Sequence, residues 1–254
     1  LQFLLAQLLG YPTPLLLTEL SRSDHPLLRY ILENALGTYQ HSLQVSNLAE
    51  QAANSVGADV LLTRVGAYYH DAGKAQNPAF FIENQPQGSI DSHDDMDPII
   101  AAQTIIAHVT DGVKLAEKYH LPPRLIDFIR EHHGTQLTRY QYNRALEQQK
   151  DDPDQVDAEL FRYPGPQPRS KETGILMLAD ITEARARSTP PKNEQELETL
   201  LHSVFENIHK DGGLKATNLT LSDLTKIQES FHKTLMNTYH PRIPYPEDRP
   251  LTKV

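Results

Sequence analysis

The chain has 254 residues, with 33 acidic side chains against 24 lysines and arginines, and it contains no cysteine. The formal net charge of -9 argues against a broad surface for DNA or RNA duplexes, and the lack of cysteine excludes disulfides, thiolate metal sites and thiol catalysis. No apolar run reaches the roughly 18 residues that a membrane-spanning helix needs, and no secretory signal is present.

The N-terminal stretch predicts a linker that precedes the domain. Residues 2–9 are apolar, although the chain starts at Leu1 and not at methionine. We therefore expect residues 1–24 to be a helical segment that follows a missing region, and residues 25–254 to form one domain. Asp24, followed by His25 and Pro26, predicts a helix start that Asp24 caps.

Apolar residues then recur at helical spacing through most of the chain. Residues 77–98 and 151–168, which are rich in proline and polar residues, are predicted to be irregular, and the first of these loops could cover the site and contact substrate. No alternating strand pattern, glycine-rich phosphate loop or internal repeat is recognisable, so we predict an all-α fold. The predicted helices span residues 37–56, 61–73, 99–110, 111–120, 124–133, 173–187, 194–210 and 221–239.

The adjacent pair His70-Asp71 is the starting point of the functional prediction. A carboxylate has two oxygens and can bridge two metal ions, whereas an imidazole nitrogen holds one. Lys74 follows at helical spacing, which places its ammonium group over the same face, where a cation suits a substrate phosphate. With 12 histidines in the chain, one His-Asp pair is a weak signal, and capping or solvated roles would explain Asp71 and Lys74 equally well.

Further donors strengthen the signal. Asp180 stands on an apolar helix, where a buried carboxylate is costly unless it is paired or bound to metal. Structural roles stay open for the histidines, as buried side chains bonded to the backbone or as polar residues of a last helical turn. Taken together, seven nitrogen and oxygen donors predict a two-metal hydrolase site, and they suit iron, manganese, zinc or nickel. The donors are His41, His70, Asp71, His108, His132, His133 and Asp180.

The order of these residues resembles the HD superfamily of metal-dependent phosphohydrolases. The stretches GTYQHSLQVSNLAEQAA, VGAYYHDAGKAQNPAFFIENQ and IDFIREHHGTQLTRYQY resemble, more narrowly, the cytoplasmic HD domain of seven-transmembrane HD receptors, which are bacterial cyclic di-AMP phosphodiesterases. The resemblance covers most of the chain from residue 25 to residue 247. Gln40 departs from it, because the family usually has histidine there. The paired histidines also lack the Gly-Tyr-Pro segment of the cyclic di-GMP branch.

The resemblance implies an α-helical HD fold with a dinuclear iron or manganese centre that hydrolyses cyclic di-AMP to linear pApA. It implies a cytoplasmic domain of a bacterial inner-membrane protein, attached through the missing N-terminal region, and it leaves a homodimer open. Asp71 would bridge the two ions. One ion would also bind His41, His70 and Asp180, and the other His108, His132 and His133.

The mechanism that we expect from this site is attack on phosphorus by a hydroxide that bridges the metals, with Lys74 stabilising the phosphoryl oxygens. Tyr39, Tyr69 and the pair Arg162-Tyr163 are candidates for substrate contacts, and packing roles would explain each of them equally well. Three alternatives stay open. The same centre could act on cyclic di-GMP, (p)ppGpp or a nucleoside phosphate. The domain could instead sense a nucleotide without turnover, or be a helical scaffold whose histidines are incidental.

Overall fold

The computed structural model describes residues 12–85, 96–152 and 155–238. Within these residues the regular secondary structure is helical, and one isolated β-bridge joins Leu137 and Arg162. The prediction of an all-α fold is confirmed. The α-helices are α2 (Pro14–Leu20), α3 (Pro26–Asn34), α4 (Leu36–Ser55), α5 (Val60–Tyr69), α6 (Pro98–Lys118), α7 (Pro123–Glu131), α8 (Arg139–Gln148), α9 (Lys171–Ser188), α10 (Glu194–Lys210) and α11 (Leu221–Thr238), and the 3-10 helices are η1 (Ala72–Gln76), η2 (Pro78–Phe80), η3 (Ile82–Asn84) and η5 (Ala158–Phe161).

Side-chain caps define several of the helix starts. Asp59, Asp97 and Asn193 each accept a hydrogen bond from a backbone N–H in the first turn of α5, α6 and α10. Ser170 begins α9 with a capping box that it shares with Thr173. These bonds satisfy N–H groups that have no partner inside the helix, and so they fix where each helix begins.

The cap of α3 differs from the prediction. His25 occupies the N-cap position, and its Nδ1 lies 3.4 Å from the backbone nitrogen of Leu27. Asp24 instead forms an exposed ion pair with Arg22. Arg22 pairs with the Asp24 carboxylate, and the N-cap hydrogen bond is made by the next polar side chain, His25.

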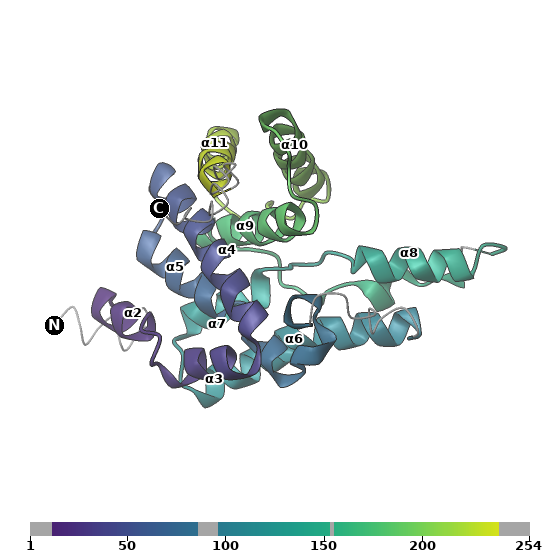
Figure 1. Ribbon diagram of the computed structural model, residues 1–254, viewed down its shortest axis with the longest axis horizontal. Coiled ribbons are helices and arrows are strands. Elements are labelled where there is room, and N and C mark those ends of the chain that lie inside the picture. The colour runs from purple at the N-terminus through teal and green to yellow at the C-terminus, as the bar shows by residue number, and fades with distance from the viewer. Residues whose placement is uncertain (1–11, 86–95, 153–154, 239–254) are drawn as a thin grey trace, which may run out of the picture.

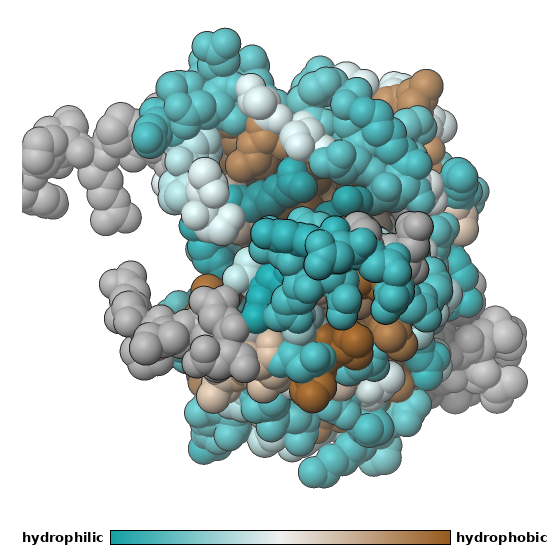
Figure 2. All heavy atoms as spheres, turned by 90° about the vertical axis from the view of Figure 1, so that its right-hand side faces the viewer, coloured by the Kyte–Doolittle hydropathy of each residue, from teal (hydrophilic) through white to brown (hydrophobic). Residues whose placement is uncertain are grey.

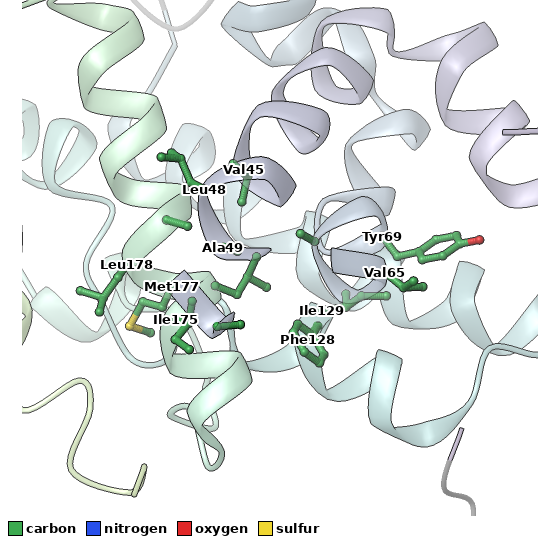
Figure 3. Close-up of a cluster of buried hydrophobic side chains, with 14 of the residues drawn as sticks. Val45, Leu48, Ala49, Val65, Tyr69, Phe128, Ile129, Ile175, Met177 and Leu178 are labelled. Atoms are coloured by element: carbon green, nitrogen blue, oxygen red, sulfur yellow. The ribbon is translucent and has the colours of Figure 1, made fainter. Parts of the chain in front are cut away.

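The main hydrophobic core lies between α4, α5, α7 and α9, and α10 and α11 cover it on the side of α9 (Figure 1). Figure 3 shows side chains from α4, α5, α7 and α9 meeting in this core, including Val45, Tyr69, Phe128 and Ile175. All four are fully buried. The packing fixes the mutual positions of the helices that carry the candidate site.

Helices α6 and α8 extend to one side of this core (Figure 1). There Ala102 of α6, Ala145 of α8 and Phe161 of η5 form a separate small cluster. Seen from this side, the surface is mostly hydrophilic with compact hydrophobic patches (Figure 2). None of the helices in the described ranges is long and apolar enough to span a membrane.

The structure differs from the prediction in two helix bounds, one helix that was not predicted and part of one loop. Helix α6 continues through Asp111-Gly112, where we predicted a break, and α5 ends at Tyr69, before His70-Asp71. Helix α8 was not predicted, because it is polar along most of its length and buries only Gln141 and Ala145. Part of the predicted loop 77–98 is ordered as η2 and η3, and residues 86–95 lie outside the described residues.

Candidate metal centre

His70 and Asp71 lie where α5 gives way to η1. His70 is the C-cap of α5, and Asp71 is the N-cap of η1. The change of helix type brings the two neighbouring side chains together, with His70 Nε2 at 3.3 Å from Asp71 Oδ2. Both side chains are buried.

Gly73 brings this segment against α6. A Cβ atom on Gly73 would lie 1.9 Å from the carbonyl oxygen of His108 and 2.5 Å from the backbone nitrogen of Gly112. Only a residue without a side chain permits such an approach. As a result, His108 Nε2 reaches to 3.4 Å from Asp71 Oδ1.

One group of four side chains gathers around Oδ2 of Asp71, and we call it the carboxylate-rich half: His41, His70, Asp71 and Asp180. The Nε2 atoms of His41 and His70 lie 3.5 and 3.3 Å from this oxygen. Asp180 Oδ1 lies 3.0 Å from His41 Nε2 and 3.7 Å from His70 Nε2. One donor atom from each residue falls within 4.8 Å of the others, so the group can hold one metal ion.

A second group gathers around Oδ1 of Asp71, and we call it the histidine-rich half: Asp71, His108, His132 and His133. The Nε2 atoms of His108 and His132 lie 3.4 and 3.5 Å from this oxygen. They lie 3.2 Å from each other, and the donors again fall within 4.8 Å of one another. The structure thus brings together all seven predicted residues, in two groups that share only Asp71.

The unsatisfied atoms of the site fit bound cations. His70 Nε2 and Asp71 Oδ1 are shielded from solvent and form no hydrogen bond. Buried polar atoms without partners are rare and costly in proteins. Divalent transition metals bind to converging imidazole nitrogens and carboxylate oxygens of this kind.

Three of the histidines are oriented by their own helical turns. The Nδ1 atoms of His70, His108 and His132 donate to the backbone carbonyl oxygens three residues earlier, at 2.7, 2.6 and 2.8 Å. A neutral imidazole carries one ring proton, so a proton on Nδ1 leaves the Nε2 lone pair free for a metal. In each case it is Nε2 that faces Asp71.

The two halves differ in charge and therefore in pKa. Burial acts to lower the pKa of His70, but the carboxylates of Asp71 and Asp180 outweigh it and raise this pKa to about 10. Burial lowers the pKa of His108 to about 3; His132 and Lys74 add to this effect, and Asp71 and the carbonyl group of Ile105 do not outweigh it. The pKa of His133 is also lowered, first by burial and then by His132.

Lys74 stands beside the carboxylate-rich half. Its Nζ lies 2.7 Å from Asp71 Oδ2 and 2.9 Å from Glu83 Oε1. Burial disfavours the ammonium form, but Asp71 and Glu83 outweigh burial and raise the pKa of Lys74, while Lys74 in turn helps to lower the pKa of Asp71. The cation is therefore held charged at the edge of the centre.

Three of the candidates for substrate contacts lie in different surroundings. Tyr69 is fully buried and donates to the carbonyl oxygen of Leu20, so its interpretation as a substrate contact gives way to a packing role. Tyr39 packs against the main core. Arg162 pairs with Glu159 at 2.8 Å and donates to the carbonyl oxygen of Thr135.

Two further residues contact the centre, of which sequence reasoning considered Tyr163 and missed Glu183. The ring of Tyr163 stacks on His133 with centroids 4.2 Å apart. Glu183, a buried residue of α9, hydrogen-bonds to His41 Nδ1. The available signal for Glu183 was its spacing of three residues from Asp180 on the same helix.

Residues 38–185 match the HD domain family. The chain is 43% identical over 239 residues to the cyclic-di-AMP phosphodiesterase PgpH of Bacillus subtilis, and 38% identical over 240 residues to that of Listeria monocytogenes. Each alignment covers 94% of this chain and 33% of the relative, so the chain spans about a third of their length. The solved L. monocytogenes PgpH HD domain in complex with cyclic-di-AMP superposes with a TM-score of 0.80 at 37% identity, covering 87% of this chain and 100% of that one.

Proposed function

This chain belongs to the HD domain family, and from that premise we propose that it is a metal-dependent phosphodiesterase that hydrolyses cyclic di-AMP to linear pApA. The observation that carries the proposal is the shared carboxylate: one oxygen of Asp71 faces His41 and His70, and the other faces His108 and His132. The names of the two PgpH relatives and the cyclic-di-AMP complex of the similar structure support the choice of substrate.

We propose that the carboxylate-rich half and the histidine-rich half each hold one ion, with Asp71 as a ligand to both. Iron or manganese is our choice, because the family resemblance implies them and the donor set of imidazole and carboxylate accepts both. When bound, such a pair draws in the anionic oxygens of a phosphodiester and makes water a better nucleophile.

The chain's own residues have separate tasks in this proposal. Asp71, with its pKa lowered by Lys74 and His70 against the effect of burial, stays ionised and joins the two halves. Lys74 supplies a fixed positive charge where phosphoryl oxygens gain negative charge, and a preorganised charge of this kind needs no reorganisation during the reaction. Glu83 is the second carboxylate, besides Asp71, that pairs with the Lys74 ammonium.

Anaerobic purification followed by metal analysis and a turnover assay on the same sample tests the proposal. We expect two ions per chain, iron or manganese, and release of pApA from cyclic di-AMP. A panel containing cyclic di-GMP, (p)ppGpp and nucleoside phosphates decides the substrate. Faster turnover of one of these compounds would replace cyclic di-AMP, and tight binding of a nucleotide without product would indicate a sensing domain.

A further inference from the structure

His41 is held differently from three of the other histidines of the centre. His70, His108 and His132 each donate Nδ1–H to a backbone carbonyl within their own helical turn. His41 Nδ1 instead bonds to the carboxylate of Glu183, 142 residues away on α9. Its orientation therefore depends on a charged side chain from another helix.

We propose that Glu183 is a positioning residue that fixes the ring and the tautomer of His41, and that it thereby controls metal occupancy of the carboxylate-rich half. The inference rests on the proposed dinuclear centre. Glu183 does not contact the donor atoms of the other histidines in any described interaction, so we expect it to act through His41 alone.

The geometry places His41 between two carboxylates of one helix. Asp180 and Glu183 are three residues apart on α9 and therefore lie on the same face. Asp180 Oδ1 lies 3.0 Å from His41 Nε2, and Glu183 Oε2 bonds to Nδ1 on the opposite side of the ring. With Nδ1–H committed to Glu183, the Nε2 lone pair is left for an ion that Asp180 and Asp71 also approach.

The carboxylate of Glu183 affects His41 more strongly than a backbone carbonyl oxygen would, because it carries a negative charge. Glu183 is only 8% exposed, so its negative charge acts on the His41 ring with little screening by water. A carboxylate that accepts the Nδ1 proton makes Nε2 a stronger donor to metal and fixes the ring orientation. The histidine-rich half has no such carboxylate behind His108 or His132, because their Nδ1 atoms are bonded to the backbone.

Arg187 holds Glu183 from the solvent side. Its Nε lies 3.7 Å from Glu183 Oε1, whereas the other oxygen, Oε2, bonds to His41. The guanidinium is 40% exposed, so this contact is screened and contributes little by itself. The two oxygens of Glu183 thus have different partners, Arg187 at Oε1 and His41 at Oε2.

The first test is the titration of metal-free protein with Mn²⁺, comparing the parent with Glu183→Gln. The amide keeps the volume of the side chain but removes its charge, and its NH₂ group can donate to Nδ1, which would move the ring proton to Nε2. We expect two ions per chain in the parent. In the variant we expect one of the two to bind about 10–100-fold more weakly, which is the usual effect of removing a partner behind a ligand.

Glu206→Gln is the matched control, because it makes the same change on α10, where Glu206 is exposed and pairs with Lys210 at 3.0 Å. We expect it to bind two ions with the affinities of the parent. Equal affinities in Glu183→Gln and the parent would overturn the inference while the dinuclear centre stands. A parent that takes up no Mn²⁺ would overturn the centre itself, and this inference with it.

A spectroscopic measurement on the parent protein tests the tautomer, and this part of the test does not depend on how well the variant folds. In Zn²⁺-loaded parent protein labelled with ¹⁵N-histidine, we expect the His41 proton on Nδ1, with the downfield shift of a proton bonded to a carboxylate. The signal should move upfield in Glu183→Gln and stay in place in Glu206→Gln. A His41 proton on Nε2 in the parent would overturn the inference.

Discussion

The two halves of the centre meet at one carboxylate but are built from different parts of the chain and carry different charges. The carboxylate-rich half draws on α4, the α5–η1 junction and α9, and it adds Asp180 to the shared Asp71. The histidine-rich half draws on α6 and the end of α7, and Asp71 is its only carboxylate. An ion therefore meets more negative charge in the first half than in the second.

This difference in charge shifts the pKa values of two histidines of the same centre in opposite directions. The pKa of His70 is raised to about 10, whereas that of His108 is lowered to about 3, although both rings are buried and both approach Asp71. Asp180, which contacts His70 at 3.7 Å, adds to the rise of the His70 pKa, whereas His132 and Lys74 add to the fall of the His108 pKa. We expect the two proposed ions to differ in affinity for this reason.

The largest expected effect comes from the residue that both halves share. Asp71→Asn keeps the shape of the side chain but removes its charge, so we expect turnover of cyclic di-AMP to fall by at least about 1000-fold, equivalent to losing about 4 kcal/mol of transition-state stabilisation. Initial rates and metal content measure it. Asp111→Asn, which breaks only a pair with Lys114 on α6, is the control. Unchanged turnover in Asp71→Asn would end the two-metal proposal.

Substituting a metal-ligating residue in one half at a time tests the two proposed ion positions separately. We expect Asp180→Asn and His133→Gln each to lower turnover by roughly 100-fold or more. Removing a residue that orients a metal ligand typically costs about 10–100-fold, and these two residues are themselves the proposed ligands. Metal analysis should show the content falling from two ions per chain towards one in both variants. If both variants kept two ions, the division into halves would be contradicted.

Metal removal should lower stability. An ion present at 100 times its dissociation constant stabilises the folded state by about 2.7 kcal/mol, which corresponds to about 5–10 °C in melting temperature for a chain of this size. We expect a chelator to lower the melting temperature of the parent by that amount. In Asp71→Asn the chelator should have much less effect, and an equal shift in the two proteins would show that the metal binds elsewhere.

The smallest expected effect is a pH dependence of the metal-free protein that differs between the halves. His70, whose folded pKa is raised, contributes stability that is fully present below its unfolded pKa of about 6.5 and is lost as pH rises towards 10. His108, whose folded pKa is lowered, contributes stability that is present above about 6.5 and is lost as pH falls towards 3.

Urea unfolding of chelated protein across this pH range checks the prediction. Replacing His70 by glutamine should flatten the alkaline side of the stability profile, and replacing His108 by glutamine should flatten the acid side. The opposite assignment of the two sides would contradict the charge difference between the halves.

The sequence predicted the amphipathic helices best. Helix α10 matches its predicted bounds, and α11 matches at its start, because their apolar residues face one side and Asn193 and Asp211-Gly212 mark the ends of α10. Gly112 misled the prediction of α6. Its role is close packing against Gly73, which local sequence does not reveal. The polar helix α8 gave too little apolar periodicity to be seen.

The seven donors were found by their order and by family resemblance, since periodicity says nothing about which histidines converge. Glu183 escaped notice because its importance comes from a contact with His41 across more than 100 residues, and the sequence could not show that Tyr163 stacks on His133. Tyr69 was a candidate for a substrate contact, but a residue adjacent to His70 on a helical turn points about 100° away, here into the core.

The contact between Gly73 and α6 helps to set the distance between the two halves of the centre, which no single metal-ligating residue sets by itself. Two backbones touch there because two methyl groups are missing, and this places the carbonyl of His108 against the segment that carries Asp71. The spacing between the two halves thus depends on how closely the two backbones pack, and not on the metal ligands. A designer who wished to widen or narrow this site for ions of another radius would begin at these glycines and leave the ligands untouched.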